Sequence, residues 1–204
     1  MSSLEHPFLK PLGRPLVLAS KSPRRSLILK QHELQFEMLP AELDESAREG
    51  EDPREYVTRL GLEKALWAAE QRPSSVCVGC DTVVLLDGEI LGKPENPQEA
   101  RAALTSLAGN EHLVLSSLAM VQAEEGFRRV GLQETRVGFR SLSPAEIEAY
   151  VATGEPFDKA GGYGIQGFGS MLVAWIQGCY FNVMGLPLEV LRRLWCEYLE
   201  SKTD

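Results

Sequence analysis

Short apolar runs alternate along the chain with longer stretches in which apolar positions recur every three or four residues. The short runs are typical of buried strands, and the periodic stretches are typical of amphipathic helices. The pattern predicts strands within residues 14–20, 34–39, 75–94, 112–124 and 128–142, and helices near residues 23–32, 53–72, 97–109, 143–154 and 186–199. Asp87-Gly88 predicts a hairpin turn inside the third strand region. This order favours an α/β (α+β mixed) fold with a mixed sheet and flanking helices over a purely doubly wound topology.

The first 14 residues differ from the rest of the chain. Residues 1–14 are polar, proline-bearing and aperiodic, so we expect a loose lead-in before a single domain of residues 15–204. The apolar runs are shorter than the roughly 20 residues that a membrane-spanning helix needs, and the N-terminus lacks a signal-peptide pattern. We therefore expect a cytoplasmic protein with no membrane partner.

The overall charge limits the class of partner. The chain of 204 residues has a formal net charge of -8, which argues against general binding to nucleic acid or to anionic lipid. A phosphorylated ligand is not excluded, because exposed charges are screened beyond about 8 Å at physiological salt. A local cluster of cations can therefore bind a phosphate even in an acidic protein.

The four cysteines do not make a zinc-binding pattern. Cys77 and Cys80 form a CxxC, but Cys179 and Cys196 lie far apart and neither neighbours another cysteine or a histidine. A zinc site would need a second ligand pair of matching spacing. A redox CxxC normally opens a helix, whereas this one lies in a strand-like run. We expect buried, reduced cysteines.

The stretch LASKSPRR, residues 18–25, places a small-residue turn and a helix start directly after an apolar run. Ser22 can cap free backbone N–H groups, and Pro23 loses no hydrogen bond at the first helical position. A helix start flanked by Arg24 and Arg25 suits a phosphate group. The same pattern also fits a capped helix with two solvated arginines, and the stretch alone does not decide between the two.

Two further positions carry charge beside predicted strands. Asp81 ends a short apolar run, and a carboxylate at a strand end can hold a divalent metal or activate a water. Lys93 lies between a glycine and a proline beyond the predicted hairpin. Taken singly, an aspartate that caps a turn and a solvated loop lysine are the commoner roles.

An acidic loop precedes the second predicted helix. The loop carries Asp44 and Glu45, and Lys64 lies on the helix that follows. Alone these residues read as surface charges. Together with the other candidates they fit a site for a triphosphate with Mg²⁺, which needs carboxylates for the metal and cations for the phosphate oxygens.

The segment GYGIQG, residues 162–167, matches G-x-G-x-x-G letter by letter. The dinucleotide-binding interpretation needs a preceding strand, a following helix and an acidic residue about twenty positions later. Here EPFDKAG precedes the glycines and a β-like SMLVAWI follows them, so we reject that interpretation. The glycines more simply allow backbone to approach a ligand, with Gln166 presented from a loop.

Taken together and in order, these stretches resemble the motifs of the Maf family of nucleoside triphosphate pyrophosphatases. The matching segments, over about residues 16–192, are LASKSPRRSLIL, DESAREGEDPREYVTRLGLEKA, GCDTVV, LGKPENPQEA, FRSLSPAEIEAYVATGEPFDKAGGYGIQG and NVMGLPL. The resemblance implies a two-lobed fold with a mixed twisted sheet and a central nucleotide cleft, similar to inosine triphosphate pyrophosphatases. It also implies a cytoplasmic, often homodimeric enzyme that uses Mg²⁺ or Mn²⁺ to split a nucleoside triphosphate into the monophosphate and pyrophosphate.

The resemblance also assigns roles to residues of this chain. Asp81 matches the family's proton acceptor and Glu45 its acidic position near the metal, so Glu45 and Asp81 are the expected metal-site residues. The positions that match the phosphate site are Ser20, Arg24, Arg25, Lys64 and Lys93. The positions that match the family's determinants of substrate specificity are Arg24, Thr82 and Gln166. Whether Asp81 acts mainly as a base or mainly as a metal ligand stays open.

Hydrogen-bond chemistry favours one branch of the family. Thymine and uracil present an N–H donor beside a carbonyl acceptor, and the Gln166 amide offers the complementary pair. A guanine edge, with adjacent donors, suits a carboxylate better, as in the branch that acts on 7-methyl-GTP. Gln166 therefore favours dTTP and UTP, with modified or noncanonical pyrimidines as further substrates. Because an amide can flip, this argument does not exclude cytosine.

Two alternatives remain at this point. One is the 7-methyl-GTP branch, and the other is a nucleotide-binding regulator of septum formation with little turnover. Asp81, together with the cations, favours catalysis over binding alone. The chain also departs from the family after the arginines, where KQHELQF replaces the usual glycine turn, and we expect a local loop change there.

Overall fold

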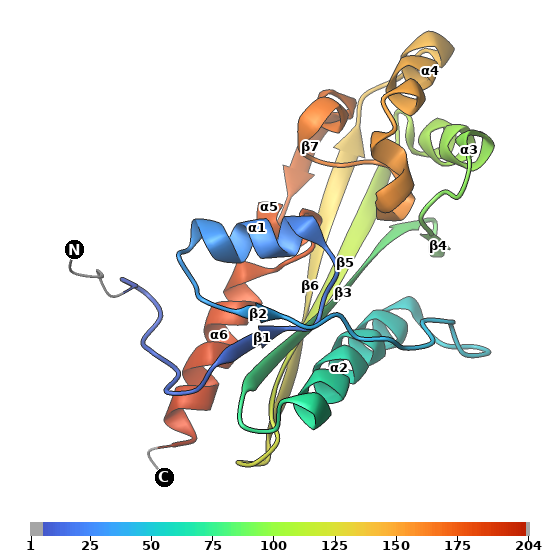
Figure 1. Ribbon diagram of the computed structural model, residues 1–204. Helices are drawn as coiled ribbons and strands as arrows, with labels where there is room; N and C mark the ends of the chain where they lie inside the picture. Colours follow the sequence, from blue (N-terminus) through green and yellow to red (C-terminus); the bar gives the residue numbers. More distant parts are fainter. Residues whose placement is uncertain (1–5, 203–204) are drawn as a thin grey trace. The chain divides into compact units, whose positions relative to one another are not determined.

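A seven-stranded mixed sheet is the framework of the computed structural model, which describes residues 6–202 (Figure 1). Its strands are β1 (Leu16–Leu18), β2 (Glu37–Met38), β3 (Val76–Leu86), β4 (Glu89–Leu91), β5 (Glu111–Gln122), β6 (Phe127–Phe139) and β7 (Val173–Gln177). The order is β2-β1-β3-β5-β6-β7, with β4 paired to β3. Strand β1 runs parallel to β2 and β3, whereas β4 and β7 run antiparallel to β3 and β6. The predicted fold class is confirmed.

Six α-helices accompany the sheet in the described residues. They are α1 (Pro23–Gln31), α2 (Pro53–Gln71), α3 (Pro97–Leu107), α4 (Pro144–Ala152), α5 (Tyr180–Val183) and α6 (Leu188–Glu200). Helices α1 to α4 each begin at a proline behind a residue whose side chain caps the first turn, namely Ser22, Asp52, Asn96 and Ser143. Proline and cap both act locally, which explains why these starts are predictable.

The glycine-rich region between α4 and α6 contains short elements that the pattern of apolar positions did not predict. It contains three short 3-10 helices, η1 (Glu155–Asp158), η2 (Ala160–Gly162) and η3 (Gly167–Leu172), as well as α5. The β-like SMLVAWI becomes β7 from Val173 onward. Residues 162–167 therefore lie between η2 and η3 rather than between a strand and a helix, which confirms that the glycine pattern is not a dinucleotide-binding motif.

The chain divides into two compact units, here called lobes. Lobe 1 consists of the described parts of Met1–Asp81, Ser117–Leu132 and Gly185–Asp204, and lobe 2 consists of Thr82–Ser116 and Gln133–Met184. The long strands β3, β5 and β6 each contribute residues to both lobes. The expected cleft, and the division into residues 1–14 and 15–204, stay predictions; residues 1–5 and 203–204 lie outside the described residues.

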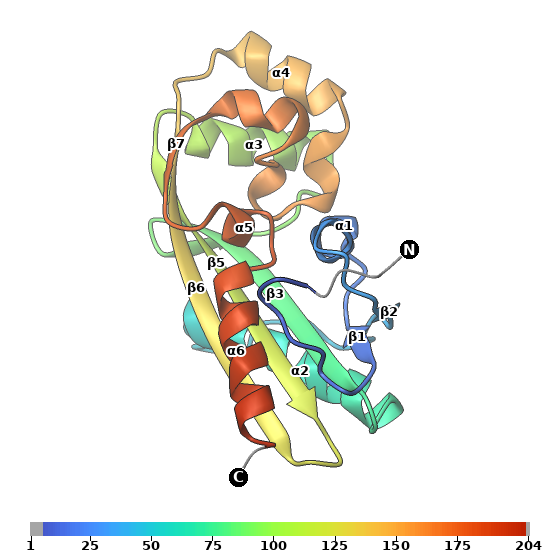
Figure 2. The same cartoon turned by 90° about the vertical axis from the view of Figure 1, so that its left-hand side faces the viewer.

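In lobe 1, helices α2 and α6 lie on opposite faces of the strands (Figures 1 and 2). Helix α2 packs through its alanines against Val17 of β1 and Cys77 of β3. The approach is very close: a Cβ added at Gly79 of β3 would lie 2.2 Å from the Gly61 carbonyl oxygen of α2. Gly61 in turn faces the Ser117 side chain of β5. Glycine is therefore required where this helix crosses the sheet.

Lobe 2 has a separate hydrophobic core. Its buried members come from β3, β5, β6, α3, α4 and the glycine-rich region, and they include Val84, Leu104, Phe139, Tyr150 and Tyr163. The β3–β4 hairpin turns where it was predicted, with φ of 51° at Asp87 and 88° at Gly88. Positive φ at both turn residues is the two-residue turn that matches strand twist.

The cysteine prediction is partly wrong. All four thiols are free, but only Cys77 and Cys80 are buried, whereas Cys179 and Cys196 are half-buried. Burial raises the pKa of Cys77 to about 12 and that of Cys80 to about 11. Both thiols of the CxxC are therefore protonated at neutral pH, which makes them poor nucleophiles and poor metal ligands.

The described part of the N-terminal lead-in, residues 6–14, has no helix or strand. It nevertheless contacts the rest of lobe 1, because the Trp195 indole donates to the Lys10 carbonyl oxygen at 2.8 Å and Arg14 pairs with Glu125 at 3.0 Å.

The turn after α1 places Glu33 at a φ of 54°, a backbone conformation that glycine adopts more readily than other residues. No helix within residues 6–202 is long and apolar enough to span a bilayer.

The crossing of α2 over β3 generates a prediction about Gly79. Gly79→Ala should lower the free energy of unfolding by about 1–3 kcal/mol, because the new methyl group would meet backbone of α2 at 2.2 and 2.4 Å. Urea titration measures the loss. Gly92→Ala is the matched control, since nothing lies within 4 Å of a Cβ there. Equal losses for both variants would contradict the close-packing argument.

Candidate functional site

The buried ammonium group of Lys64 lies between two carboxylates in lobe 1. Its Nζ is 2.7 Å from Asp81 Oδ1 and 2.8 Å from Glu45 Oε1. Lys64 and Asp81 are 7% and 8% exposed, whereas the Glu45 side chain is about half exposed at 48%. The sequence treated these three as separate candidates, and the fold brings them together.

The position of Asp81 differs from the prediction. Asp81 does not end a strand; it lies in the interior of β3, which continues to Leu86. Because Gly61 and Gly79 let α2 lie almost directly on β3, the Lys64 side chain, one turn beyond Gly61, reaches Asp81. A lysine pointing into the sheet face would otherwise be an unpaired buried charge, so the pair also stabilises the crossing.

Asp81 and Glu45 are also the residues that could hold a metal. No cluster of three or more metal-ligating side chains occurs within residues 6–202. Mg²⁺, however, commonly takes only one or two protein carboxylates and completes its shell with waters and substrate phosphates. Two carboxylates held at one ammonium group therefore fit a divalent cation that arrives with a triphosphate.

The acidic loop that carries Glu45 is anchored to α2. The Tyr56 hydroxyl donates to the Glu45 carbonyl oxygen at 2.8 Å, and Arg59 donates to the Ser46 carbonyl oxygen at 3.1 Å. Arg59 also pairs with Glu51 at 2.5 Å, and this pairing lowers the pKa of Glu51 to about 2. Burial, followed by the charges of Asp81 and Glu45, raises the pKa of Tyr56. The loop is thus held in place beside the two carboxylates.

Asp44 has a different role from its neighbour Glu45. Its Oδ1 accepts the Ser46 backbone N–H at 2.9 Å, and hydrogen bonds from Ser46 lower the pKa of Asp44. Asp44 is therefore a turn residue of the loop, as the commoner role of aspartate suggests. Sequence reasoning placed Tyr56 on the apolar face of its helix and did not consider Arg59, because neither residue type gives a signal of which loop it contacts.

The second group of predicted residues lies at the start of α1. Arg25 is 9% exposed, so the alternative of two solvated arginines is wrong for this residue. Its Nε donates to the Gly185 carbonyl oxygen at 2.7 Å and its Nη1 donates to Ser20 Oγ at 3.0 Å. Arg24 is half-buried on the same first turn. The Ser22 side chain caps that turn, as predicted, by accepting the Arg25 backbone N–H.

These two groups lie near each other within lobe 1. Leu18 of β1 pairs with Val78 of β3 in parallel, so Ser20 and Asp81 both follow that pairing in the carboxyl direction of neighbouring strands. Burial raises the pKa of the Cys80 thiol, and the charges of Arg25 and Lys64 oppose this shift. Positive and negative groups therefore converge around Cys80, at the side of parallel strands where ligands usually bind.

Lobe 2 carries the other three predicted residues, Thr82, Lys93 and Gln166. Thr82 is half-buried, next to Asp81 along the chain, and its Oγ1 lies 2.9 Å from Ser116 Oγ. Ser116 is fully buried and donates to the Asn182 carbonyl oxygen at 3.0 Å. Thr82 is thus linked through a buried serine to the NVMG segment that the sequence analysis noted for resemblance only.

Gln166 is exposed on a short loop whose backbone is held on both sides. Glu155 accepts the Phe168 N–H at 2.9 Å and the Gly169 N–H at 3.2 Å through its two carboxylate oxygens. On the other side, the Tyr150 hydroxyl accepts the Gly164 N–H at 3.2 Å. The loop is therefore fixed by side chains from α4 and η1, while the Gln166 side chain faces solvent.

Lys93 is exposed on a turn that contacts the same glycine-rich region. The Gly161 N–H donates to the Gly92 carbonyl oxygen at 3.0 Å, and Pro94 lies against Gly162. Tyr163 belongs to the same region, and its hydroxyl lies 2.7 Å from His112 Nε2. Burial lowers the pKa of His112 to about 4. A neutral, buried histidine therefore supports the segment that leads to Gln166.

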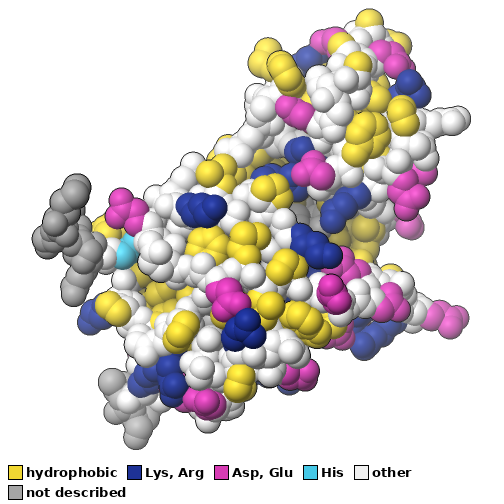
Figure 3. Space-filling view, in the orientation of Figure 1, with side chains coloured by type: hydrophobic (Ala, Val, Ile, Leu, Met, Phe, Trp, Pro, Cys, Tyr) yellow, Lys and Arg dark blue, Asp and Glu magenta, His cyan; other side chains and the backbone are white. Residues whose placement is uncertain are grey.

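Surface charges of both signs lie close to one another (Figure 3). Acidic and basic side chains are intermingled on the face that Figure 3 shows.

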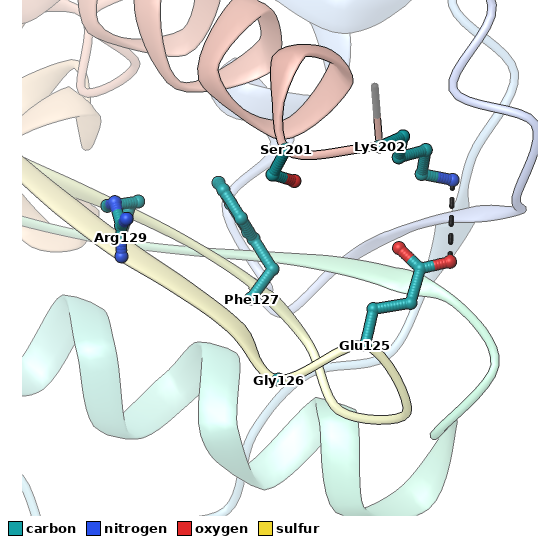
Figure 4. Close-up of a pocket in the computed structure, with 6 residues that line it drawn as sticks. All are labelled: Glu125, Gly126, Phe127, Arg129, Ser201 and Lys202. Carbon is teal, nitrogen blue, oxygen red and sulfur yellow. Dashed lines mark ion pairs between the residues drawn. The ribbon is translucent and has the colours of Figure 1, made fainter. Parts of the chain in front are cut away.

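One pocket of lobe 1 lies at the β5–β6 turn and the end of α6 (Figure 4). It is lined by Glu125, Gly126, Phe127, Arg129, Ser201 and Lys202. The Lys202–Glu125 ion pair, 3.4 Å long, lies across it, and none of its lining residues is a predicted site residue.

The chain is similar to known proteins over most of its length. A sequence model of the family described as "Maf-like protein" matches residues 15–198. A dTTP/UTP pyrophosphatase of Syntrophus aciditrophicus is 45% identical over 184 residues, which are 90% of each chain. Proteins of the same name from Shewanella denitrificans and Moorella thermoacetica are 46% and 48% identical, over 91% and 88% of this chain and 96% and 92% of theirs.

The Lys64 bridge generates a prediction about stability. Lys64→Met should lower the free energy of unfolding by about 3–5 kcal/mol at pH 7, because it leaves the buried Asp81 charge without its cation. Glu45→Gln should change it by no more than about 1 kcal/mol, since the Glu45 side chain is about half exposed. Arg48→Met, which removes an exposed pair with Glu63, is the control. Equal losses for Lys64→Met and Glu45→Gln in urea titration would contradict this ranking.

Proposed function

The chain belongs to the family of Maf-like proteins, and we propose that it is a nucleoside triphosphate pyrophosphatase that acts on dTTP and UTP. Three relatives with that name align over at least 88% of this chain and at least 90% of their own length. The observation in the structure that carries the proposal is the buried Lys64, bound to Asp81 and Glu45. This arrangement supplies both signs of charge that a triphosphate and its metal require.

In the proposed reaction, Asp81 orients a water molecule and accepts its proton as the water oxygen attacks the α-phosphorus. The bond from that phosphorus to the oxygen bridging the α- and β-phosphates breaks, and pyrophosphate leaves with the bridging oxygen. Lys64 holds the Asp81 carboxylate in a fixed orientation through the 2.7 Å contact. Asp81 remains an acceptor because a carboxylate has more lone pairs than one ammonium group uses.

Negative charge develops on the leaving pyrophosphate and must be offset. Arg24, Arg25 and Ser20 at the start of α1 are proposed to bind phosphate oxygens together with the helix N-terminus. Lys64 and Lys93 complete the cationic set. A divalent cation, Mg²⁺ or Mn²⁺, held by Glu45 and Asp81, would add neutralising charge on the phosphates.

Base choice is proposed to depend on the three residues Arg24, Thr82 and Gln166. The Gln166 amide can accept from the N–H and donate to the carbonyl of uracil or thymine. Glu155 and Tyr150 fix the backbone on both sides of this side chain, so the amide is presented from a rigid frame. Modified pyrimidines that keep the same edge would also be substrates.

The other interpretations from sequence gain no support. The relatives are named for dTTP and UTP rather than for a methylated guanine nucleotide, and that name describes catalysis rather than binding alone. The divalent cation, the homodimer and the cytoplasmic location stay predictions that rest on the resemblance and, for the cation, on the two carboxylates at Lys64.

The proposed function predicts the outcome of a panel of nucleoside triphosphates assayed with Mg²⁺ or Mn²⁺ for pyrophosphate release. We expect dTTP and UTP to be the best substrates, with the monophosphate as the second product. Asp81→Asn should reduce kcat by at least about 100-fold, because general base catalysis contributes that much. Preference for 7-methyl-GTP, binding without pyrophosphate release, or near-normal turnover by Asp81→Asn would each refute the proposal.

The role of Gln166 predicts a base-selective loss. Gln166→Glu should lower kcat/KM for dTTP and UTP by about tenfold or more relative to purine nucleotides, because a carboxylate cannot donate to the base carbonyl. The same panel measures this ratio. Gln177→Glu is the control, since Gln177 is an exposed glutamine of the same lobe at the end of β7. An equal loss for every base would assign Gln166 a structural role instead.

A further inference from the structure

The acidic loop, residues 41–52, leads directly into α2 (Figure 1), and six of its twelve residues are acidic. Like charges at this density repel one another and favour an unfolded loop unless a cation ties it down. Only Glu51 among them turns its side chain away from solvent: that side chain is 8% exposed, whereas the other five acidic residues are exposed. The loop therefore has one buried carboxylate, and the partner of that carboxylate decides how the loop is held.

The partner is Arg59 of α2. Its Nε and Nη2 donate to the two carboxylate oxygens of Glu51 at 2.5 and 2.7 Å, which is the two-point contact that a guanidinium group makes best. Nη2 also donates to the Ser46 carbonyl oxygen at 3.1 Å, and Nη1 donates to Glu63 at 3.1 Å. The Arg59 side chain is only 13% exposed. All three of its nitrogens are thus engaged by the loop or by its own helix.

The Glu51 carboxylate extends this contact to a second point of the loop backbone. Its Oε2 accepts the Arg48 backbone N–H at 3.0 Å. The Arg59–Glu51 pair therefore ties the backbone at Ser46 and at Arg48, immediately after Glu45. The hydrogen bonds from Arg59 lower the pKa of Glu51 to about 2, so the pair stays ionised at neutral pH.

We propose that Arg59, through Glu51, is a positioning residue that holds Glu45 where it can bind a divalent cation. The inference rests on the proposed function, which assigns the cation to Glu45 and Asp81, and it adds a residue that acts only through the loop. Outer residues that orient a metal ligand typically contribute 10–100-fold to metal affinity. The buried Arg59–Glu51 pair is such an outer contact, because it fixes the backbone next to the ligand rather than the ligand itself.

The test measures Mn²⁺ binding directly, with no turnover. The intact protein is saturated with a UTP analogue in which a methylene group replaces the oxygen between the α- and β-phosphates, and EPR follows the loss of free Mn²⁺. The analogue titrated without protein gives the background. Arg59→Gln should raise the Kd for Mn²⁺ by about tenfold or more.

Arg48→Met is the matched control for this measurement. It removes a cation from the same region, but the Arg48 guanidinium is 67% exposed and pairs with Glu63 at the surface. The Arg48 backbone N–H, which Glu51 accepts, is unchanged by the substitution. The Kd for Mn²⁺ should therefore stay within about twofold of the wild-type value.

Three further variants distinguish positioning from a general loss of structure. Glu51→Gln keeps the size of the side chain but removes its charge, and it should raise the Kd by about threefold or more. Arg59→Lys keeps the charge without the two-point geometry and should also raise it. In a Glu45→Gln background, Arg59→Gln should cause no further rise, because the residue that it positions no longer binds the cation. Glu51→Gln decides the matter if Arg59→Gln does not fold.

The outcomes separate this inference from the proposed function. A wild-type protein that releases no pyrophosphate from dTTP or UTP would refute the proposed function. If the wild-type protein does hydrolyse them, an unchanged Kd for Mn²⁺ in both Arg59→Gln and Glu51→Gln overturns the inference and leaves the function standing. An equal rise in Arg48→Met, or a further rise when Arg59→Gln is added to Glu45→Gln, would also overturn it.

Discussion

The site in lobe 1 depends on how closely helix α2 lies on strand β3. Gly61 and Gly79 remove side chains at the crossing, and the helix backbone comes near enough for Lys64 to reach Asp81. The same approach brings the acidic loop before α2 to Lys64, because Tyr56 ties that loop to the helix. A buried cation between two carboxylates requires such fixed geometry, since removing the Lys64 ammonium group would leave the buried Asp81 carboxylate uncompensated.

Side chains that hold the backbone are the corresponding feature of lobe 2. The loop of Gln166 is held by acceptors from Glu155 and Tyr150, and Thr82 Oγ1 lies 2.9 Å from the buried Ser116 Oγ. Hydrogen bonds from α4 and η1 on both sides limit the arrangements that this loop can adopt.

Much of the fold could be predicted from the sequence, because its signals are local. Four helices begin at a capping residue followed by proline, and the β3–β4 turn follows from Asp87-Gly88. The errors have a tertiary origin. Asp81 was expected to end a strand, but the pairing of β3 with its neighbours continues beyond it. The half-buried positions of Cys179 and Cys196 likewise depend on packing that no local pattern records.

The sequence by itself determined the order of elements, the family resemblance and the residue types of the candidate site, since periodicity, caps and motifs are properties of neighbouring positions. Only the tertiary structure decided which of those residues meet. Lys64 and Asp81 are 17 positions apart, and Ser116 and Asn182 are 66 positions apart. Whether such groups touch is set by the packing of helix on sheet and strand on strand, which is so close that a Cβ at Gly79 would lie 2.2 Å from the α2 backbone.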